Sequence, residues 1–143
     1  DVPDITDKGW ITNSYHVDIR EEIDAFEKLN IEGALQRYST GGAVSYVETS
    51  PLYNNVGAVL KFYAHLYEAI IYSELNFESD VCGVCKYSGI MDNDPETLDW
   101  VCPVCGNRDQ TKLSVVRRTC GYLGETTWTK GRKLDILNRI KHL

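Results

Sequence analysis

The stretch CGVCKYSGIMDNDPETLDWVCPVC, residues 82–105, contains two C-x2-C pairs with sixteen residues between them. Two residues between cysteines allow a tight turn, here called a knuckle, that aims both thiolates at one ion. Gly83, Pro103 and Gly106 favour such turns. Two knuckles supply four thiolates, which complete a tetrahedral shell. The spacing therefore predicts a zinc ribbon with the metal ligands Cys82, Cys85, Cys102 and Cys105.

A complete four-thiolate shell leaves no open coordination position, so the predicted metal is structural rather than catalytic. Iron in a rubredoxin-like setting is the competing occupant, because the same ligands bind it. Two metal-free redox pairs are disfavoured, since neither pair opens a helix in a βαβ pattern. A ribbon alone would suggest a nucleic-acid module, but residues 86–100 carry several acidic side chains and a single lysine. They would repel phosphate, and we expect no nucleic-acid partner.

Composition and charge are those of a globular chain of one domain's length. Of the 143 residues, 43% are hydrophobic and 25% charged. Residues 1–100 hold 18 acidic and 6 basic side chains, whereas residues 101–143 hold 3 and 9. We interpret the basic segment as neutralising an acidic surface of the chain or of a partner. The sequence has no apolar run of the ~18 residues that a membrane span needs, so we expect no membrane partner. Five cysteines, four of them in close pairs, favour a reducing compartment, and the cytoplasm is expected.

Periodicity predicts a mixed α/β fold with three helices and short extended segments. Residues 18–30 are typical of a helix that Asp18 caps, with Glu21 three positions later. The glycine-containing turn at 39–42 leads into a short strand at 43–48. Apolar residues at three- and four-residue steps predict a long helix with a broad buried face. The expected long helix covers 54–77, the β-rich segment 112–118 and the terminal amphipathic helix 131–143.

The fifth cysteine lies in VVRRTCGYLGETTW, residues 115–128, and is followed directly by Gly121. By spacing alone, Cys120 and Gly121 would be read as a turn. The run R-x-C-G-Y-L-G, from Arg118 to Gly124, closely resembles the glycyl-radical loop of anaerobic (class III) ribonucleoside-triphosphate reductases. TNSYHVDI (12–19), YSTGGAVSYVE (38–48), the long helix and the ribbon are similar to that family's C-terminal region, in the same order. The resemblance covers essentially the whole chain.

This resemblance implies that Gly121 carries a radical generated by a separate S-adenosylmethionine-dependent activase with an iron–sulfur cluster. Glycine suits that role, because a radical α-carbon flattens and glycine has no Cβ to oppose the planar geometry. The stored radical would pass to a cysteine of a catalytic barrel and start reduction of a ribonucleoside triphosphate. Arg118, Cys120 and Tyr122 would frame the loop, and for Cys120 a packing role competes with a redox one.

The implied fold is the C-terminal part of a ten-stranded glycyl-radical enzyme barrel. Residues 1–78 would come from the edge of the barrel, 79–109 would form the zinc ribbon, and 110–143 the radical loop and a terminal helix. No cysteine precedes Cys82, so the catalytic cysteines of the barrel are absent from this chain. The implied partners are the remainder of the reductase (barrel and allosteric module), the activase and a second copy in a homodimeric enzyme.

Two alternatives accompany this interpretation. The chain could be a stand-alone spare glycyl-radical subunit, or a zinc-ribbon interaction module without catalysis. Within the main interpretation, an excised fragment and a split-gene product both remain open. The three histidines are interpreted as ordinary core or surface residues rather than ligands; they are His16, His65 and His142.

Overall fold

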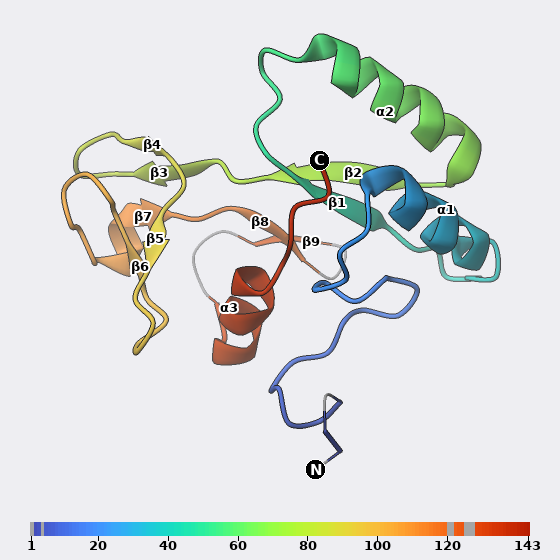
Figure 1. Ribbon diagram of the computed structural model, residues 1–143. Helices are drawn as coiled ribbons and strands as arrows, with labels where there is room; N and C mark the ends of the chain where they lie inside the picture. Colours follow the sequence, from blue (N-terminus) through green and yellow to red (C-terminus); the bar gives the residue numbers. More distant parts are fainter. Residues whose placement is uncertain (1, 4, 120–121, 125–127) are drawn as a thin grey trace. The chain divides into compact units, whose positions relative to one another are not determined.

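The computed structural model describes residues 2–3, 5–119, 122–124 and 128–143. These residues form a mixed α/β fold, as the sequence predicts, with helices and several small sheets (Figure 1). The chain divides into two compact units. We call Asp1–Trp10 with Glu78–Leu137 the ribbon unit, and Ile11–Phe77 with Asn138–Leu143 the βαβ unit.

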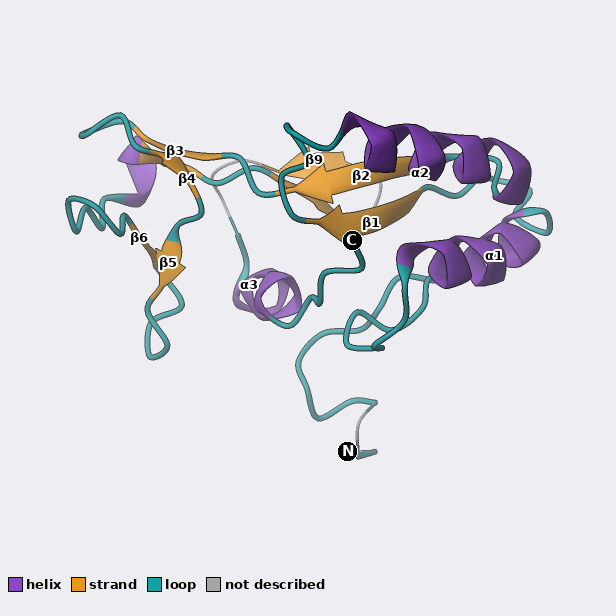
Figure 2. Cartoon of the chain, turned by 45° about the horizontal axis from the view of Figure 1, so that its top comes forward, coloured by secondary structure: helices purple, strands orange, loops and turns teal. Residues whose placement is uncertain are grey.

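The βαβ unit contains two parallel strands joined by a helix. Strand β1 (Ser45–Thr49) leads through α2 (Val56–Ala69) into β2 (Ser73–Phe77). The strands pair in register from Ser45–Ser73 to Thr49–Phe77, and α1 (Ala25–Gln36) lies beside this βαβ element (Figure 2). Parallel strands need such a crossover helix, because their ends lie too far apart for a hairpin. The core of the unit consists of Ala25, Leu29, Val47, Phe62 and Ile70.

Helix α1 begins later than the sequence predicts. Its N-cap is Asp24, whose carboxylate accepts hydrogen bonds from the backbone N–H groups of Phe26 (2.8 Å) and Glu27 (2.9 Å). Asp18, the predicted cap, instead accepts from the N–H of Arg20 at 3.0 Å and closes a separate turn. The predicted start was wrong because both aspartates can cap, and the helix follows the second.

The long helix predicted over 54–77 is in fact a helix followed by a strand. Asn55 caps α2, which ends at Ala69, and Ile70 is already extended with φ −142° and ψ 151°. The β-branched pair Ile70 and Ile71 favours that extended backbone, and residues 73–77 then bond to β1.

The broad buried face predicted for this helix is also wrong. Within α2, whose residues are all described, Phe62 is buried, whereas Leu60 is 64% and Tyr67 89% exposed. The periodicity marks an apolar face, of which Phe62, Leu66 and Ala69 pack on the core while the rest is exposed.

The ribbon unit is built from very short strands around a small core. Its elements are β3 (Asp80–Cys82), β4 (Ser88–Gly89), β5 (Asp92–Asn93), β6 (Trp100–Val101), η1 (Gln110–Lys112), β7 (Leu113–Ser114), β8 (Arg117–Thr119), β9 (Tyr122–Gly124) and α3 (Lys130–Leu137). Antiparallel strands form a three-stranded sheet in the order β4-β3-β7 and the pairs β5–β6 and β8–β9. The core contains Cys82, Met91, Trp100, Cys102, Leu113 and Val115, with Tyr87, Trp128 and Ile136 packed against it.

The terminal helix is shorter than the predicted 131–143. Helix α3 ends at Leu137, and Lys133 Nζ from its middle pairs with Asp99 Oδ1 at 2.8 Å within the ribbon unit. Helix α3 and the segment before it therefore complete the ribbon unit.

Residues 138–143 belong to the βαβ unit instead of continuing the helix. The N–H of Ile140 donates to the carbonyl of Ile19 at 3.0 Å, and the N–H of His142 donates to the carbonyl of Glu48 at 2.8 Å. These backbone groups find partners outside the helix, which is why the helical pattern of the tail is not realised. No helix in the described ranges is both long and apolar enough to cross a membrane.

Candidate functional site

The four paired cysteines converge on one point. Their sulfur atoms all lie within 4.8 Å of one another, with Cys82 and Cys105 3.7 Å apart and Cys85 and Cys102 3.6 Å apart. A tetrahedral ion with metal–sulfur bonds of about 2.3 Å has sulfur–sulfur edges of about 3.8 Å. A disulfide would need about 2.05 Å. The geometry therefore fits four thiolates around one ion and not two disulfides.

The two knuckles are built alike. In each, the carbonyl of the first cysteine accepts a hydrogen bond from the N–H four residues later, and its own N–H donates to the carbonyl five residues later. This local repeat turns the second cysteine back toward the first, so each pair offers two sulfurs on one side. The bonds are Lys86 N to Cys82 O (2.9 Å), Cys82 N to Tyr87 O (2.9 Å), Gly106 N to Cys102 O (2.9 Å) and Cys102 N to Asn107 O (3.0 Å).

Each knuckle ends in a left-handed residue. Gly106 has φ 70°, a conformation that costs glycine little. The equivalent residue of the first knuckle is Lys86, with φ 62°, whose Nζ reaches back to the carbonyl of Gly83 at 2.9 Å. The backbone shape required by the metal ligands is thus kept even where the sequence does not supply glycine.

Neighbouring groups shift the pKa values of two of the thiols in opposite directions. The backbone N–H of Cys85 lowers the pKa of Cys82 to about 6, although burial opposes the effect. Cys105 behaves oppositely. The N–H of Asn107 lowers its pKa, but partial desolvation of the sulfur and the three neighbouring sulfurs outweigh this and raise it to about 12. Four thiolates at these distances repel one another, so full ionisation requires a cation between them.

The described residues contain no other group of three or more possible metal ligands. His16 uses its ring nitrogens on the carbonyls of Ser14 and Val44, at 2.9 and 2.8 Å. His142 contacts the carbonyl of Ile23 at 3.0 Å, and burial lowers its pKa. His65 packs edge-on against Phe26.

The β8–β9 hairpin carries the sequence motif that resembles a radical loop. Arg118 pairs with Leu123, and Thr119 pairs with Tyr122, so the described strands meet on both sides of Cys120 and Gly121. Those two residues themselves lie outside the described residues. The side chain of Arg118 is half-buried, and that of Thr119 is fully buried.

Asp80 and Arg117 form an ion pair at the base of this hairpin that the sequence analysis missed. Arg117 is 4% exposed and Asp80 0%, and the two guanidinium Nη atoms bond to the two carboxylate oxygens. The partners are 37 residues apart in the chain. In the sequence, the one feature that pointed to this ion pair was a second arginine beside Arg118. That feature does not identify the carboxylate with which Arg117 pairs.

Gly124 completes the base of the hairpin on the other strand. A Cβ built on Gly124 would lie 2.5 Å from the indole of Trp128, too close for any substituted residue without movement. Trp128 in turn packs against the ribbon core. A side chain at Gly124 would therefore displace the indole of Trp128.

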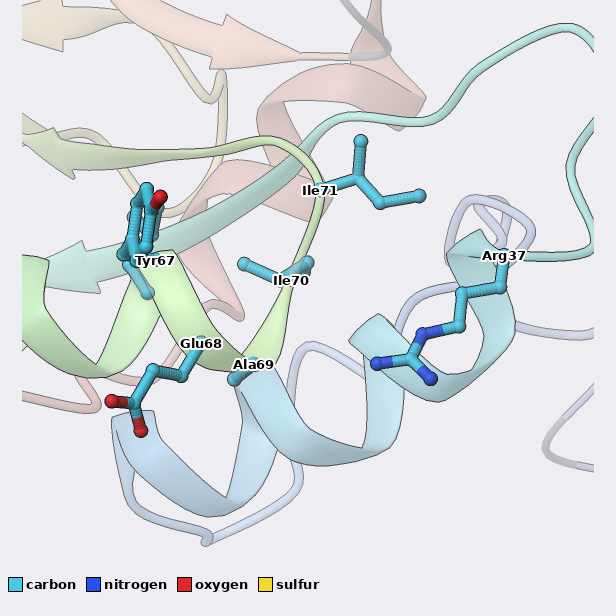
Figure 3. Close-up of a pocket in the computed structure, with 7 residues that line it drawn as sticks. Arg37, Tyr67, Glu68, Ala69, Ile70 and Ile71 are labelled. Carbon is cyan, nitrogen blue, oxygen red and sulfur yellow. The ribbon is translucent and has the colours of Figure 1, made fainter.

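A separate pocket of about 460 Å³ lies in the βαβ unit, at the end of α2 (Figure 3). Its walls are mainly aliphatic and aromatic, with one arginine and one glutamate, and it is lined by none of the sequence-predicted site residues that the structure describes. Such a lining offers no converging set of polar groups, so it supplies no candidate chemistry. The lining residues are Arg37, Leu66, Tyr67, Glu68, Ala69, Ile70 and Ile71.

Comparison with known proteins gives a consistent result. The family model for anaerobic ribonucleoside-triphosphate reductase matches residues 2–142. The chain is 38% identical to the anaerobic ribonucleoside-triphosphate reductase of Enterobacteria phage T4, over 99% of this chain and 24% of that protein. It is 34% identical to the enzyme of that name from Haemophilus influenzae (97% and 20%) and 32% identical to that of Escherichia coli (99% and 20%).

A solved structure of an anaerobic ribonucleotide reductase shares the fold. It superposes with a TM-score of 0.52 at 18% identity, over 76% of this chain and 15% of that chain. The chain thus spans between about a seventh and a quarter of the length of these relatives.

Proposed function

Because the chain belongs to the anaerobic ribonucleoside-triphosphate reductase family, we propose that it is the part of such an enzyme that stores the radical, on Gly121. The observation that carries the proposal is the β8–β9 hairpin, whose paired residues Thr119 and Tyr122 flank Cys120 and Gly121 directly after the four-cysteine ribbon. The motif residues Arg118, Cys120 and Tyr122 would hold the path of the loop around that glycine.

The proposed chemistry starts at the α-carbon of Gly121. An activase reduces S-adenosylmethionine by one electron from its iron–sulfur cluster, which breaks a carbon–sulfur bond and leaves an organic radical. That radical takes one hydrogen atom from the α-carbon, so a neutral glycyl radical remains. The unpaired electron is shared with the flanking amide nitrogen and carbonyl, which requires a planar carbon that a Cβ would hinder.

Turnover would return the hydrogen atom. The glycyl radical takes a hydrogen atom from a thiol of the catalytic barrel, and the resulting thiyl radical takes the 3′ hydrogen of a ribonucleoside triphosphate. Loss of the 2′ hydroxyl follows. This chain would contribute the radical store, and the remainder of a homodimeric cytoplasmic reductase would contribute the ten-stranded barrel and the allosteric module. We propose the division 1–78 for the barrel edge, 79–109 for the ribbon and 110–143 for the radical loop and terminal helix.

Zinc is the proposed ion at Cys82, Cys85, Cys102 and Cys105. The sulfur–sulfur distances of 3.6 and 3.7 Å and the all-thiolate donor set support it. With no ligand position left over, the ion would stabilise the ribbon unit rather than take part in the reaction.

The test is radical formation in the reductase that contains this chain. With activase, S-adenosylmethionine and a reductant, without oxygen, we expect an electron paramagnetic resonance signal dominated by one α-hydrogen coupling. Admission of oxygen should cut the backbone at Gly121, since a carbon radical adds oxygen and the peroxyl product fragments. Gly121→Ala should abolish both results.

Gly41→Ala is the matched control, because a Cβ at Gly41 meets nothing within 4 Å. The Gly41→Ala protein should keep the electron paramagnetic resonance signal and the oxygen-induced cleavage at Gly121. An active activase that produces neither radical nor cleavage would overturn the proposal and favour the interaction module. Cleavage at another glycine would assign the radical to that glycine instead of Gly121.

A further inference from the structure

We propose that Arg117 is a positioning residue that fixes the radical-bearing hairpin against both cysteine knuckles of the ribbon. This inference rests on the proposed function, because it concerns the same hairpin. It adds two residues, Arg117 and Asp80, that neither the motif nor the metal shell includes.

Arg117 and Asp80 form a buried ion pair. Arg117 Nη2 donates to Asp80 Oδ2 at 3.0 Å, and Nη1 donates to Oδ1, which makes a two-pronged contact. Asp80 Oδ2 also accepts from the backbone N–H of Met91 at 3.0 Å. A second carboxylate, Glu78 Oε1, lies 4.0 Å from Nη2. A fork of this kind fixes the direction of the arginine as well as its distance.

The partners of Arg117 occupy equivalent positions beside the two pairs of predicted metal ligands. Asp80 precedes Cys82, the first ligand of one knuckle, by two residues. Trp100 precedes Cys102, the first ligand of the other knuckle, by two residues, and its ring centroid lies 5.8 Å from Arg117 Cζ. One guanidinium therefore contacts the equivalent position in both halves of the ribbon. Its contacts are complete only when the two halves are closed on each other.

The opposite strand of the hairpin is held to the same core. Arg117 pairs with Gly124 across the base of the hairpin, and Gly124 leaves room for Trp128, which packs on the ribbon core. Both strands are thus fixed at their base, three positions before Cys120 on one side and three after Gly121 on the other. A shift at Arg117 is carried along β8 to the residue that must meet an activase.

A buried ion pair often adds little net stability compared with apolar residues of similar size, because both charges must be desolvated. What it adds is a defined geometry. Hydrogen-atom transfer needs reacting atoms held to within about 1 Å, and a misplacement of that order costs about 100-fold in rate. The role we assign to Arg117 is therefore to set position, with stability a secondary effect.

The test compares Arg117→Lys with Arg108→Lys in the full reductase. Arg117→Lys keeps the charge but loses the fork; Arg108 makes an exposed pair with Asp94 in the same ribbon, at 2.6 Å. We measure bound metal per chain and the rate of radical formation by electron paramagnetic resonance. Arg117→Lys should keep the metal and slow radical formation about tenfold or more. Arg108→Lys should match the unsubstituted protein.

A second measurement covers the case in which Arg117→Lys loses metal. Hydrogen exchange of the amides of residues 117–119 and 122–124 is followed in the unsubstituted protein with and without metal. The inference expects metal removal to speed this exchange at least tenfold. Unchanged exchange would overturn it, as would normal radical formation in metal-loaded Arg117→Lys. If the unsubstituted protein itself forms no radical, the proposed function fails. The exchange measurement still decides whether the hairpin is coupled to the four-cysteine site.

Discussion

Cys82 and Cys102 are fully buried in the ribbon core, whereas Cys85 and Cys105 face solvent, yet all four are needed to surround an ion. We expect Cys82→Ser or Cys105→Ser to lower bound zinc from about one per chain to nearly none, because a three-thiolate shell binds far more weakly. Cys120→Ser should leave the metal content unchanged. Metal analysis of freshly purified protein is the measurement, and loss of zinc from Cys120→Ser would contradict the ligand assignment.

The two knuckles offer a matched pair of backbone variants. Gly106→Ala should lower the free energy of unfolding by about 1 kcal/mol, since φ 70° is strained for a residue with a Cβ. Lys86→Gly should change it by less than about 0.5 kcal/mol, because relief of the strained φ is offset by the extra chain entropy of glycine. Denaturant unfolding of the metal-loaded protein measures both. Equal losses of stability at the two positions would contradict the role assigned to the left-handed φ at the end of each knuckle.

At the scale of elements, two helical glycines should respond in opposite directions. A Cβ at Gly33 in α1 would collide with the carbonyl of Ala69, whereas a Cβ at Gly57 in α2 meets at nearest Asn55 Oδ1 at 4.0 Å. Gly33→Ala should cost on the order of 2 kcal/mol through overpacking. Gly57→Ala should stabilise by up to about 1 kcal/mol through helix propensity. Thermal unfolding distinguishes them, and a neutral Gly33→Ala would contradict the close approach of the helices.

The elements also show which features the sequence could predict. The knuckles followed from spacing because both pairs are local turns, and the strand at 45–49 matched its β-branched pattern. The start of α1 depended on a choice between Asp18 and Asp24, and local propensity does not decide between two good caps. The end of α2 depended on pairing between β1 and β2, which is not local. The pair of Asp80 and Arg117 spans 37 residues and could not be read from either neighbourhood.

At the scale of the whole molecule, metal removal should act unevenly. The ribbon core contains two of the cysteine ligands, whereas the core of the βαβ unit contains none. Chelation should therefore remove protection from the amides of β3 and β7 and leave α1 protected, because metal-binding energy is folding energy only where the ligands lie. Hydrogen exchange with mass spectrometry measures this. Simultaneous loss of protection in both units would show that they unfold as one.

The last residues of the chain are fastened in both units, and this has a consequence for damaged protein. If oxygen cuts at Gly121, the remnant from 122 onward still includes Trp128, which packs against the ribbon core, the contact of Lys133 with Asp99, and the contact of Arg139 with Glu48. A nicked molecule would then keep its short piece and co-purify as if whole under native conditions. The backbone cut would be visible only after denaturation. A spare copy of the segment that carries Gly121 could take its place only after the old piece is displaced.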